Sequence, residues 1–489
     1  MTRFAKVLIA NRGEIAVRIA RTLRTLEIPS VVAHHATDAD SLACREADEA
    51  YEIAGNPPSA AYLDVTAIVA ACRATGADAV HPGYGFLSEN AAFARAVEAA
   101  GIRFIGPSPE AIELMGDKVR ARRFVAEGGF PVLEAADEED APETFARRAA
   151  AIGFPLLIKA AAGGGGRGMR IVGDAAELEA QLSIAKGEAA RYFGDGRLYC
   201  ERYVERSRHI EVQVLGDAEG HVVHFGEREC SIQRRFQKIV EEAPAPGIGE
   251  ELRGRLCEAA VGIARAMGYT NAGTVEFILA PDGAFYFLEM NTRLQVEHPV
   301  TEAVTGFDLV REQVRIAAGE ALGYGQEAIG RQGHAVECRI YAEEPEAEFT
   351  PAVGEVLLFN PPSGPGIRFD SGVTAGQRVT AAFDPLLAKL IAHGATRAEA
   401  LERARTALRE LVLLGVATNA AYLERVLGHP DFRSGAVSTH FLTDHAEALA
   451  LPPPTEEEQA LLVAAAALTQ GAAPPAAPAL YAAMGSWRN

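Results

Sequence analysis

The segment Leu288–Pro299, LEMNTRLQVEHP, gathers side chains that can bind metals, anions and protons at the end of an apolar run. Its acids Glu289 and Glu297 are accompanied by Asn291, and a further acid, Glu276, lies upstream in GTVEFIL. Carboxylate and amide oxygens are the hard ligands that suit Mg²⁺ when it bridges nucleotide phosphates. The segment therefore predicts metal-assisted chemistry on a phosphate, provided that the fold brings these residues together.

A β-hairpin would bring the acids onto one face. Asp282-Gly283 is a favoured two-residue turn, and a turn there places Glu276 directly opposite Glu289. Their Cβ atoms would be about 4.5–5.5 Å apart, a distance at which like charges repel, so a divalent cation is favoured over two acids splayed into water. Asn291 would share the face because strand side chains alternate. An extended chain beyond it would add three more residues to that face: Arg293, Gln295 and Glu297.

A glycine-rich stretch, KAAAGGGGRG at 159–168, is suited to binding phosphate. It is not a P-loop, because Met169 follows where that motif requires Lys and then Ser or Thr. It is not a dinucleotide fingerprint either, since it lies between the strand-like segments FPLLIKA and MRIV and opens no helix. Backbone N–H groups without bulky side chains suit phosphate oxygens, as in the glycine-rich loop of kinases, and Lys159 adds a charge. Phosphate binding is favoured over a surface loop without a ligand.

Basic residues beside these motifs predict an anion pocket. Alone, QRRFQK is typical of a solvated strand face, but neighbouring phosphate and metal sites favour an anion. Glu297, next to His298, could act as a general base on a small acid. His209, in RSRHIEVQV, alternates on a strand and by itself indicates an ordinary polar position. The candidate basic residues are Arg234, Arg235, Lys238, Arg293 and Arg339.

The elements that must position these residues begin with an open α/β unit. KVLIANRGEIAVRIARTLRTLEIPSVVAHH predicts strand, polar turn, amphipathic helix and strand. Residues 1 to about 115 therefore predict a parallel sheet, whose ligands bind at the carboxyl ends of strands, where NRGE and HPGYGFLSEN fall. MGDKVRARRFVAEGG predicts a helix with a basic face, and residues 198 to 246 predict mostly strands. The last forty residues predict a Pro/Ala-rich linker around one helix.

Composition excludes several classes of protein. The 489 residues carry a net charge of −19, which argues against a general nucleic-acid or anionic-membrane binder. Six scattered cysteines without a CxxC pair indicate free thiols in a reducing compartment. The start of the chain resembles neither a signal peptide nor a transit segment, and no apolar run reaches the about 20 residues of a membrane span. These features predict a cytoplasmic protein without nucleic-acid or membrane partners.

Seven ordered motifs over residues 3 to about 446 resemble the biotin carboxylase family, the ATP-grasp components of biotin-dependent carboxylases. They are ANRGEIA, HPGYGFLSEN, MGDK, KAAAGGGGRGM, ECSIQRRFQKIVEEAPAPG, EMNTRLQVEHPVTE and GHAVECRIYAE. The resemblance implies a multidomain α/β and α+β fold. Its parts would be a Rossmann-like N-terminal domain at 1–115, an ATP-grasp domain at 116–330 with a mobile lid at about 133–204, a C-terminal α+β domain at 331–446 and a tail at 447–489.

The resemblance also implies a role for each site residue. The residues implied to bind ATP are Lys118, Lys159, Gly165, Gly166, Glu201, His209, Glu276 and Glu289. The ligands of Mg²⁺ or Mn²⁺ would be Glu276, Glu289 and Asn291. Bicarbonate would be held by Lys238, Arg293, Gln295 and the backbone of Val296. Glu297 would be the base that deprotonates bicarbonate, and Arg339 would stabilise the biotin enolate.

The implied reaction is the carboxylation of biotin on a carrier protein or domain. Deprotonated bicarbonate attacks the γ-phosphate of ATP, and the resulting carboxyphosphate releases CO₂ and phosphate beside the ureido ring of biotin. The phosphate then takes the N1′ proton. In such phosphoryl transfer, positioning and charge neutralisation supply most of the catalysis.

Two positions depart from the family pattern. Phe236 stands where many members have His or another polar residue near the nucleotide, and Arg202 replaces the commoner Lys in the strand thought to meet adenine. No Met is followed by Lys, so the Met-Lys-Met biotin acceptor is expected on another chain or segment. The ending YAAMGSWRN faintly resembles the lead-in to the next domain of long acyl-CoA carboxylase α-subunits, which raises the hypothesis of a longer polypeptide. Implied partners are a biotin carboxyl carrier protein, a second copy in a homodimer, and a carboxyltransferase.

Two alternative functions stay open. One is an ATP-grasp ligase for another acid, such as a carbamoyl-phosphate or amino-acid ligase, which the segments RLQVEHPVTE and QRRFQK disfavour. The other is a non-catalytic nucleotide-binding subunit, and the complete set of acids, lysines and arginines argues against it. In the favoured function, the choice of the final carboxyl acceptor lies with a separate carboxyltransferase.

Overall fold

The computed structural model describes residues 4–138, 144–161, 169–452 and 455–471 of the chain. Residues 1–449 form one compact unit and residues 450–489 a second. The second unit contains one described helix, α18 (Glu456–Gly471), as predicted for the tail. Among the described residues, none of the helices has the length and apolar character needed to cross a membrane. All six cysteines are free thiols, as predicted.

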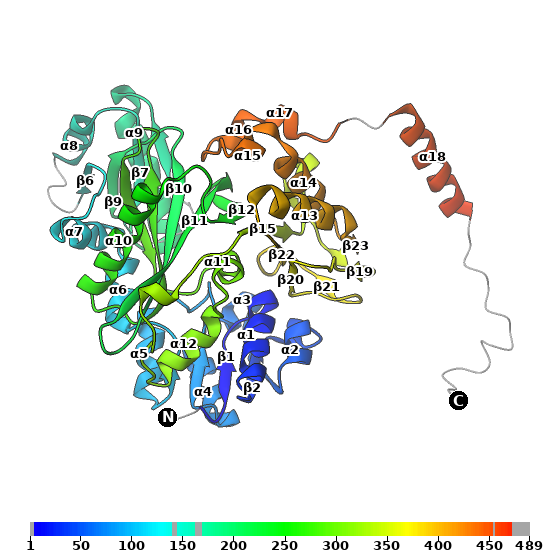
Figure 1. The fold of residues 1–489 in the computed structure, drawn as a ribbon, viewed down its shortest axis with the longest axis horizontal. Coiled ribbons are helices and arrows are strands. Elements are labelled where there is room, and N and C mark those ends of the chain that lie inside the picture. Colours follow the sequence, from blue (N-terminus) through cyan, green and yellow to red (C-terminus); the bar gives the residue numbers. More distant parts are fainter. Residues whose placement is uncertain (1–3, 139–143, 162–168, 453–454, 472–489) are drawn as a thin grey trace. The chain divides into compact units, whose positions relative to one another are not determined.

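The N-terminal part is a five-stranded parallel sheet, drawn blue to cyan in Figure 1, with the strand order β3-β2-β1-β4-β5. Between the central strands β1 and β4 the direction of strand succession reverses, which is where ligands of open α/β sheets bind. The NRGE turn follows β1 and the HPGYG turn follows β4, so both predicted ligand-binding turns meet at this point. The strands are β1 (Val7–Ile9), β2 (Ser30–His34), β3 (Glu49–Glu52), β4 (Ala79–His81) and β5 (Arg103–Phe104).

Helices of this part pack on the sheet through the apolar periodicity of the sequence. In α1 (Gly13–Thr25), Ile15, Ile19 and Leu23 are buried at intervals of four, as predicted. The other helices here are α2 (Leu42–Glu46), α3 (Pro58–Ala61), α4 (Val65–Thr75) and α5 (Ala91–Ala99).

An eight-stranded antiparallel sheet forms the centre of the unit, in the order β14-β13-β10-β11-β12-β15-β22-β20. Because β12 pairs with β15, with Val240 opposite Cys338, the sheet runs without interruption across residue 330. Its strands are β10 (Arg208–Gly216), β11 (Val222–Arg234), β12 (Gln237–Ala243), β13 (Asn271–Leu279), β14 (Phe285–Asn291), β15 (His334–Tyr341), β20 (Ile367–Ser371) and β22 (Leu386–Gly394).

The two faces of this sheet differ in chemistry because side chains alternate along each strand. In β10, Ile210, Val212 and Val214 belong to a hydrophobic core that includes residues of α10 (Glu250–Ala266). The intervening residues His209, Glu211 and Gln213 therefore point to the opposite face. That polar face is buried as well, and it carries the candidate site.

A smaller four-stranded sheet, β6-β9-β7-β8, contains the strands on either side of the predicted phosphate-binding stretch. These flanking strands, β7 and β8, pair antiparallel and confirm the strand-like segments FPLLIKA and MRIV. Residues 162–168, and with them Gly165 and Gly166, lie outside the described residues. The elements are β6 (Ala135–Asp137), α8 (Phe145–Ile152), β7 (Leu156–Ala160), β8 (Arg170–Val172), α9 (Ala175–Phe193) and β9 (Leu198–Arg202).

The helix predicted for MGDKVRARRFVAEGG is confirmed from Lys118 onward, but its first residues belong to the preceding helix. The chain forms α6 (Pro109–Gly116) and α7 (Lys118–Glu127), separated at Asp117, whose backbone is extended at φ −97° and ψ 107°. The Asp117 carboxylate accepts hydrogen bonds from the N–H groups of Val119 and Arg120 and so caps α7. This break sets Lys118 at the first position of α7, where its own N–H donates to the Ala161 carbonyl at 3.1 Å.

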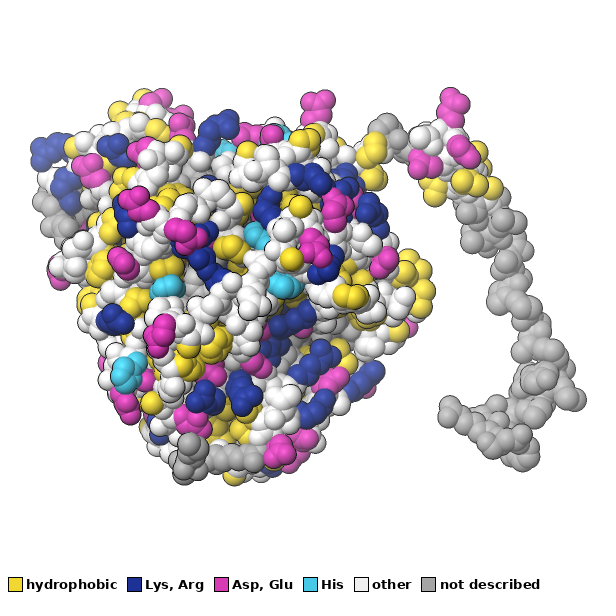
Figure 2. Space-filling model, viewed as in Figure 1, with side chains coloured by type: hydrophobic (Ala, Val, Ile, Leu, Met, Phe, Trp, Pro, Cys, Tyr) yellow, Lys and Arg dark blue, Asp and Glu magenta, His cyan; other side chains and the backbone are white. Residues whose placement is uncertain are grey.

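The remaining elements flank the central sheet. Figure 1 shows α11 and α13 beside it, and α11 packs on β15 and β11 whereas α13 packs on β22 and β15. On the face seen in Figure 2, Lys and Arg side chains are interspersed with Asp and Glu. The helices are α11 (His298–Thr305), α12 (Leu309–Ala317), α13 (Arg397–Glu410), α14 (Ala420–Gly428), α15 (Pro430–Ser434), α16 (Phe441–Asp444) and α17 (Ala446–Leu449). Short strand pairs are β16 (Glu343–Glu344) with β17 (Thr350–Pro351), β18 (Gly354–Glu355) with β21 (Arg378–Val379), and β19 (Leu358–Asn360) with β23 (Val412–Leu414).

Candidate active site

The β13–β14 hairpin places Glu276 opposite Glu289, as predicted. The route differs from the prediction, because Leu279 faces Phe285 and the turn comprises the three residues 281–283, with Gly283 at φ 86°. A register shift between Glu276 and Phe277 then leaves one extra residue in β14. The longer turn and the bulge compensate each other, so the acids meet although the predicted two-residue turn is wrong.

Glu276 is a buried carboxylate surrounded by donors. One of its oxygens accepts from Lys238 Nζ at 2.9 Å, from the Asn291 amide at 2.8 Å and from the Gln295 amide at 2.7 Å. The other oxygen lies 2.9 Å from Nε2 of His209. Burial alone would raise the pKa of Glu276, but Lys238 and then His209 outweigh it and hold the pKa well below its usual value. Glu276 is therefore ionised at neutral pH.

Lys238 joins three carboxylates of the polar face. Its Nζ donates to Glu276, to Glu297 at 2.7 Å and to Glu211. Burial would lower the pKa of Lys238, yet the three acids, Glu211 foremost, raise it well above its usual value. The lysine is thus a fixed positive charge that connects the predicted metal-binding acid to the predicted base.

Glu297 is fully buried between Lys238 and Arg339. Its second oxygen accepts from Arg339 Nη2 at 3.0 Å, and Arg339 Nε donates to Glu241 at 2.6 Å. Burial opposes ionisation, but Lys238, then Arg339 and Arg228, hold the pKa of Glu297 well below its usual value. The proposed base and the proposed biotin-binding arginine are therefore in direct contact.

The extended path predicted beyond Asn291 is wrong. Strand β14 ends at Asn291, the chain bends at Arg293, and Glu297 lies in a turn before α11. Arg293 points to Glu89 of the HPGYGFLSEN motif, with Nε 2.8 Å from the carboxylate, and also donates to the Asn291 side-chain oxygen at 2.8 Å. Gln295 reaches Glu276 through this bend. The residues converge because the chain turns, and not because they share one strand face.

The carbonyl of Val296, whose backbone is predicted to meet bicarbonate, accepts from Lys389 Nζ at 2.8 Å. Lys389 is fully buried and lies 3.2 Å from Glu14 of the NRGE turn. The lysine of β22 therefore fixes the backbone of the active-site loop and ties it to the N-terminal sheet.

Two further lysines contact the predicted ATP-binding acids. Lys118 forms an ion pair with Glu289, and Lys159 forms one with Glu201 of β9. Burial would raise the pKa of Glu289, but Lys118 lowers it and outweighs both burial and the like charge of Glu276. Both acids of the hairpin are thus ionised, and each already has a lysine partner.

The residues predicted to hold Mg²⁺ fit a divalent cation in their donor chemistry. Glu276 and Glu289 are opposed, ionised carboxylates, and an amide lies beside them at Asn291, which is a set of hard oxygen ligands. Lys118 and Lys238 neutralise the same carboxylates, so repulsion between the acids does not by itself require a metal. The fit rests on the ligand types and their ionisation.

The predicted cluster of five basic residues divides into two groups. Lys238 and Arg339 contact Glu297, and Arg293 joins them through Asn291. Arg234 instead pairs with Glu343 at 2.8 Å and lies over the ring of Phe349. Arg235 and Phe236, with φ of 49° and 67°, form the exposed tip of the β11–β12 hairpin. The prediction that Arg234 and Arg235 belong to one anion pocket with the others is therefore wrong.

Several residues of the network were not identified as site residues from the sequence. Glu211 faces both Glu276 in β13 and Arg228 in β11, and Arg228 is fully buried beside it. The period of two in RHIEVQV puts Glu211 on the face of His209, and that signal could have identified it. Nothing local marks Glu241, because its role depends on the distant partner Arg339.

Three family models match successive parts of the chain. The N-terminal domain of biotin carboxylase matches residues 3–112, and the ATP-binding domain of the carbamoyl-phosphate synthase L chain matches residues 117–324. The C-terminal domain of biotin carboxylase matches residues 337–444.

Similar proteins extend over nearly the whole chain. A biotin carboxylase of Halalkalibacterium halodurans is 49% identical over 447 residues, which are 90% of this chain and 98% of the relative. A biotin carboxylase of a Nostoc species is 47% identical over 448 residues, which are 90% of this chain and 99% of the relative. The biotin carboxylase domain dimer of Hydrogenobacter thermophilus 2-oxoglutarate carboxylase, in complex with MgADP, ADP and bicarbonate, has a TM-score of 0.90 at 44% identity and covers 93% of this chain and 100% of that chain. This chain belongs to the biotin carboxylase family.

Proposed function

We propose that this chain is an ATP-dependent ligase that carboxylates biotin with bicarbonate, the first half-reaction of a biotin-dependent carboxylase. One observation carries the proposal: Lys238 contacts both Glu276 and Glu297, while Arg339 contacts the other oxygen of Glu297. A single buried network therefore connects the nucleotide side of the site to the biotin side, as a reaction that passes a carboxyl group from one to the other requires.

ATP and its metal occupy the hairpin side of this network. Mg²⁺ or Mn²⁺ is held by Glu276, Glu289 and Asn291, and when bound it neutralises charge on the nucleotide phosphates. The ion pairs Lys118–Glu289 and Lys159–Glu201 place both lysines where they can turn to phosphate oxygens. The residues assigned to ATP are Lys118, Lys159, Gly165, Gly166, Glu201, His209, Glu276 and Glu289.

Bicarbonate is held by Lys238, Arg293, Gln295 and the backbone of Val296, with Glu297 as the base. A carboxylate with a strongly lowered pKa is a weak base. Glu297 can accept a proton only after its neighbouring cations turn in part to another anion. Bicarbonate is itself an anion and competes with Glu297 for Lys238. Each hydrogen bond that passes from the carboxylate to bicarbonate raises the pKa of Glu297 and brings proton transfer within reach.

The deprotonated bicarbonate oxygen attacks the γ-phosphorus of ATP, and the bond from that phosphorus to the ADP oxygen breaks. The carboxyphosphate formed then breaks at its carbon–oxygen bond into CO₂ and phosphate. Phosphate takes the N1′ proton of biotin, and N1′ bonds to the carbon of CO₂. Arg339 stabilises the negative charge that develops on the ureido oxygen of biotin during this last step.

The proposal includes the partners expected of a carboxylase. Biotin arrives on a carrier protein or domain, and a carboxyltransferase passes the carboxyl group to its final acceptor. Relatives include components of a pyruvate carboxylase and of a methylcrotonoyl-CoA carboxylase, and one solved relative is a dimer. A homodimer, a cytoplasmic location, boundaries near residues 115, 330 and 446, and a mobile lid at about 133–204 stay part of the proposal.

ATP hydrolysis measured with and without bicarbonate, and with and without free biotin, tests the function. We expect hydrolysis to require bicarbonate and to rise when biotin is added. Hydrolysis that depends on a different acid and ignores biotin would indicate another ATP-grasp ligase. Nucleotide binding without turnover under all four conditions would indicate a non-catalytic subunit.

A further inference from the structure

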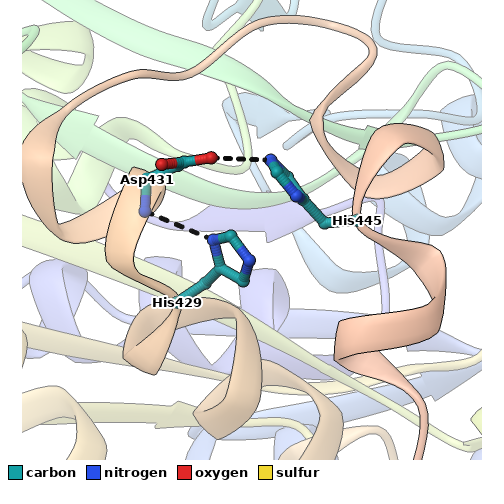
Figure 3. Close-up of side chains that lie close together, drawn as sticks. All are labelled: His429, Asp431 and His445. Atoms are coloured by element: carbon teal, nitrogen blue, oxygen red, sulfur yellow. Dashed lines mark hydrogen bonds and ion pairs between the residues drawn. The ribbon is translucent and has the colours of Figure 1, made fainter.

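One group of metal-ligating side chains outside the active site lies in the C-terminal part of the compact unit: His429, Asp431 and His445. One ligand atom from each lies within 4.8 Å of those of the other two. Figure 3 shows both imidazole rings and the carboxylate close together. His429 and Asp431 lie at the start of α15, and His445 directly follows α16. His445 Nε2 is 3.1 Å from an oxygen of Asp431. None of these residues contacts the network around Lys238.

Buried aromatic rings fix the position of the two imidazoles. The rings of His429 and His445 have centroids 4.1 Å apart, and the ring of Phe441 lies 4.7 Å from His445 and 5.4 Å from His429. Phe441 is buried, and so is Phe432, whose ring lies 6.1 Å from that of Phe441. His429 and Asp431 are held by the start of α15, and His445 by the end of α16. The ligand atoms are therefore positioned by the fold before any ion binds.

We propose that His429, Asp431 and His445 bind a divalent transition-metal ion of the Zn²⁺ or Ni²⁺ class. Metal–ligand bonds of about 2.0–2.1 Å in a tetrahedron put ligand atoms about 3.3 Å apart, and the Asp431–His445 distance of 3.1 Å already matches this spacing. Two imidazoles and one carboxylate suit such ions, whereas Mg²⁺ prefers oxygen ligands alone. The Asp431 and His445 side chains are 51% and 25% exposed, so an ion can enter and water can complete its shell.

The competing interpretation is an ion pair beside a helix cap. His429 Nδ1 accepts a hydrogen bond from the Asp431 N–H at 3.3 Å, longer than the usual range of 2.7–3.2 Å for such bonds. Metal binding through either nitrogen of His429 breaks this hydrogen bond. A metal on Nδ1 takes the lone pair that accepts the bond, and a metal on Nε2 leaves the proton on Nδ1, which then cannot accept. A long and weak bond is a small loss against a metal–imidazole bond. Geometry thus favours the metal when the ion is present.

A bound ion would connect α15 to the α16–α17 segment. Both ends of α16 contact the loop after β9. His440, directly before α16, has Nε2 3.1 Å from the Tyr203 hydroxyl, and Asp444, its last residue, pairs with Arg206 at 2.9 Å. The expected consequence is greater thermal stability of this docking. The chemistry of the active site is not expected to change, because no member of the triad touches it.

The experiment uses the untagged chain with Ni²⁺ or Zn²⁺, and measures stoichiometry, affinity and the shift in melting temperature. His445→Gln and Asp431→Asn remove one ligand each at exposed positions. His221→Gln is the matched control, since it removes a His from a different group of metal-ligating side chains, Asp217, Glu219 and His221, in which His221 Nδ1 is 3.0 Å from Asp217. We expect one saturable site in the wild type and in the control, affinity at least 10-fold weaker in both ligand variants, and a rise in Tm of about 2 °C or more at saturating metal.

Equal affinity in all four proteins, loss of the site in His221→Gln only, or no saturable binding would overturn the proposal. Bicarbonate-dependent ATP hydrolysis at the wild-type rate shows that the ligand variants are folded, so lost binding is then attributable to the lost ligand. Co²⁺ provides a separate check. A thiolate charge-transfer band would show that a cysteine binds the ion and would also overturn the proposal, whereas a spectrum of nitrogen and oxygen ligands supports it.

Discussion

On the polar face that carries the candidate site, the two halves of the central sheet bury carboxyl groups with opposite results. On β13 and β14, the pKa values of Glu276 and Glu289 are held below their usual value. On β12 and β15, burial raises the pKa of Glu241 to about 7 and that of Glu337 well above its usual value. Burial favours the neutral form in all four positions, so the difference must come from the partners.

Cations are distributed unevenly between these halves. Glu276 has two cationic partners, His209 and Lys238, the latter shared with Glu211 and Glu297. Glu241 shares Arg339 with Glu297, and neither carboxyl oxygen of Glu337 has a hydrogen-bond partner among the described residues. The supply of cations, and not depth of burial, therefore decides which of these four acids are charged. Glu276 and Glu289 are kept ionised, whereas the raised pKa values of Glu241 and Glu337 favour their neutral forms.

Glu297→Gln tests the charged side and should have the largest effect. It removes the proposed base and leaves Lys238 and Arg339 short of a negative partner. We expect bicarbonate-dependent ATP hydrolysis to fall by about 10²–10⁴-fold, with ATP binding retained because the nucleotide residues are unchanged. Steady-state hydrolysis and nucleotide titration measure the two. Wild-type carboxylation by this variant would remove Glu297 from the role of base.

Arg339→Ala acts at the boundary between the halves. It removes the group proposed to hold the biotin enolate and deprives Glu241 and Glu297 of their shared cation. We expect biotin carboxylation to fall by about 10²-fold or more, and bicarbonate-dependent ATP cleavage to fall much less. Arg339→Lys is the control, since it keeps the charge without the forked geometry and should give an intermediate loss. Equal losses in both assays would contradict the enolate role.

Much of the charged half could be predicted from the sequence. The Asp282-Gly283 turn signal predicts the hairpin, but the direct opposition of Glu276 and Glu289 also depends on a longer turn and a bulge that compensate each other. The alternation of strands and a helix predicts the parallel sheet, and the resemblance to the biotin carboxylase family implies the roles of Lys238, Glu297 and Arg339.

What could not be predicted depends on contacts between distant residues. Arg293 leaves the strand direction because Glu89, 204 positions earlier, holds its guanidinium. Lys389 fixes Val296 from 93 positions away. No local pattern shows that Glu241 must share its arginine, so the protonated half is visible only once the strands are placed. Sequence periodicity predicts which face a residue occupies, whereas its ionisation depends on partners that the whole fold supplies.

Glu14→Gln tests the protonated side through pH. Burial raises the pKa of Glu14 to about 7, against an ordinary value of 4.5, although Lys389 opposes the shift. The folded state therefore binds more protons than the unfolded state between these values, and its stability falls as pH rises from about 4.5 through 7. At most this loss is about 1.4 kcal/mol per pH unit. Gln cannot titrate, so the loss disappears in the variant.

Calorimetric Tm values of the wild type and Glu14→Gln at pH 5 and pH 7 measure this difference. We expect the fall in Tm between these pH values to be about 2–3 °C smaller in the variant. Glu241 and Glu337 titrate alike in both proteins, so their contributions cancel. An unchanged or larger fall in Glu14→Gln would mean that Lys389 keeps Glu14 ionised, and the contrast between the halves would not extend to the NRGE turn.

Glu337→Gln should have the smallest effect, although the residue is fully buried beside the active-site network. If the carboxyl group is already neutral, an amide of the same shape replaces it without the loss of a charge. We expect bicarbonate-dependent hydrolysis within about 2-fold of wild type and a stability change of about 1 kcal/mol or less, as for an ordinary substitution. Glu276→Gln is the matched comparison, since the same chemical change there removes a charge from Lys238. A loss of about 3–5 kcal/mol of stability in Glu337→Gln would instead equal the cost of breaking a buried ion pair. Glu337 would then be charged and paired with Lys389, and the supply of cations would not distinguish the two halves.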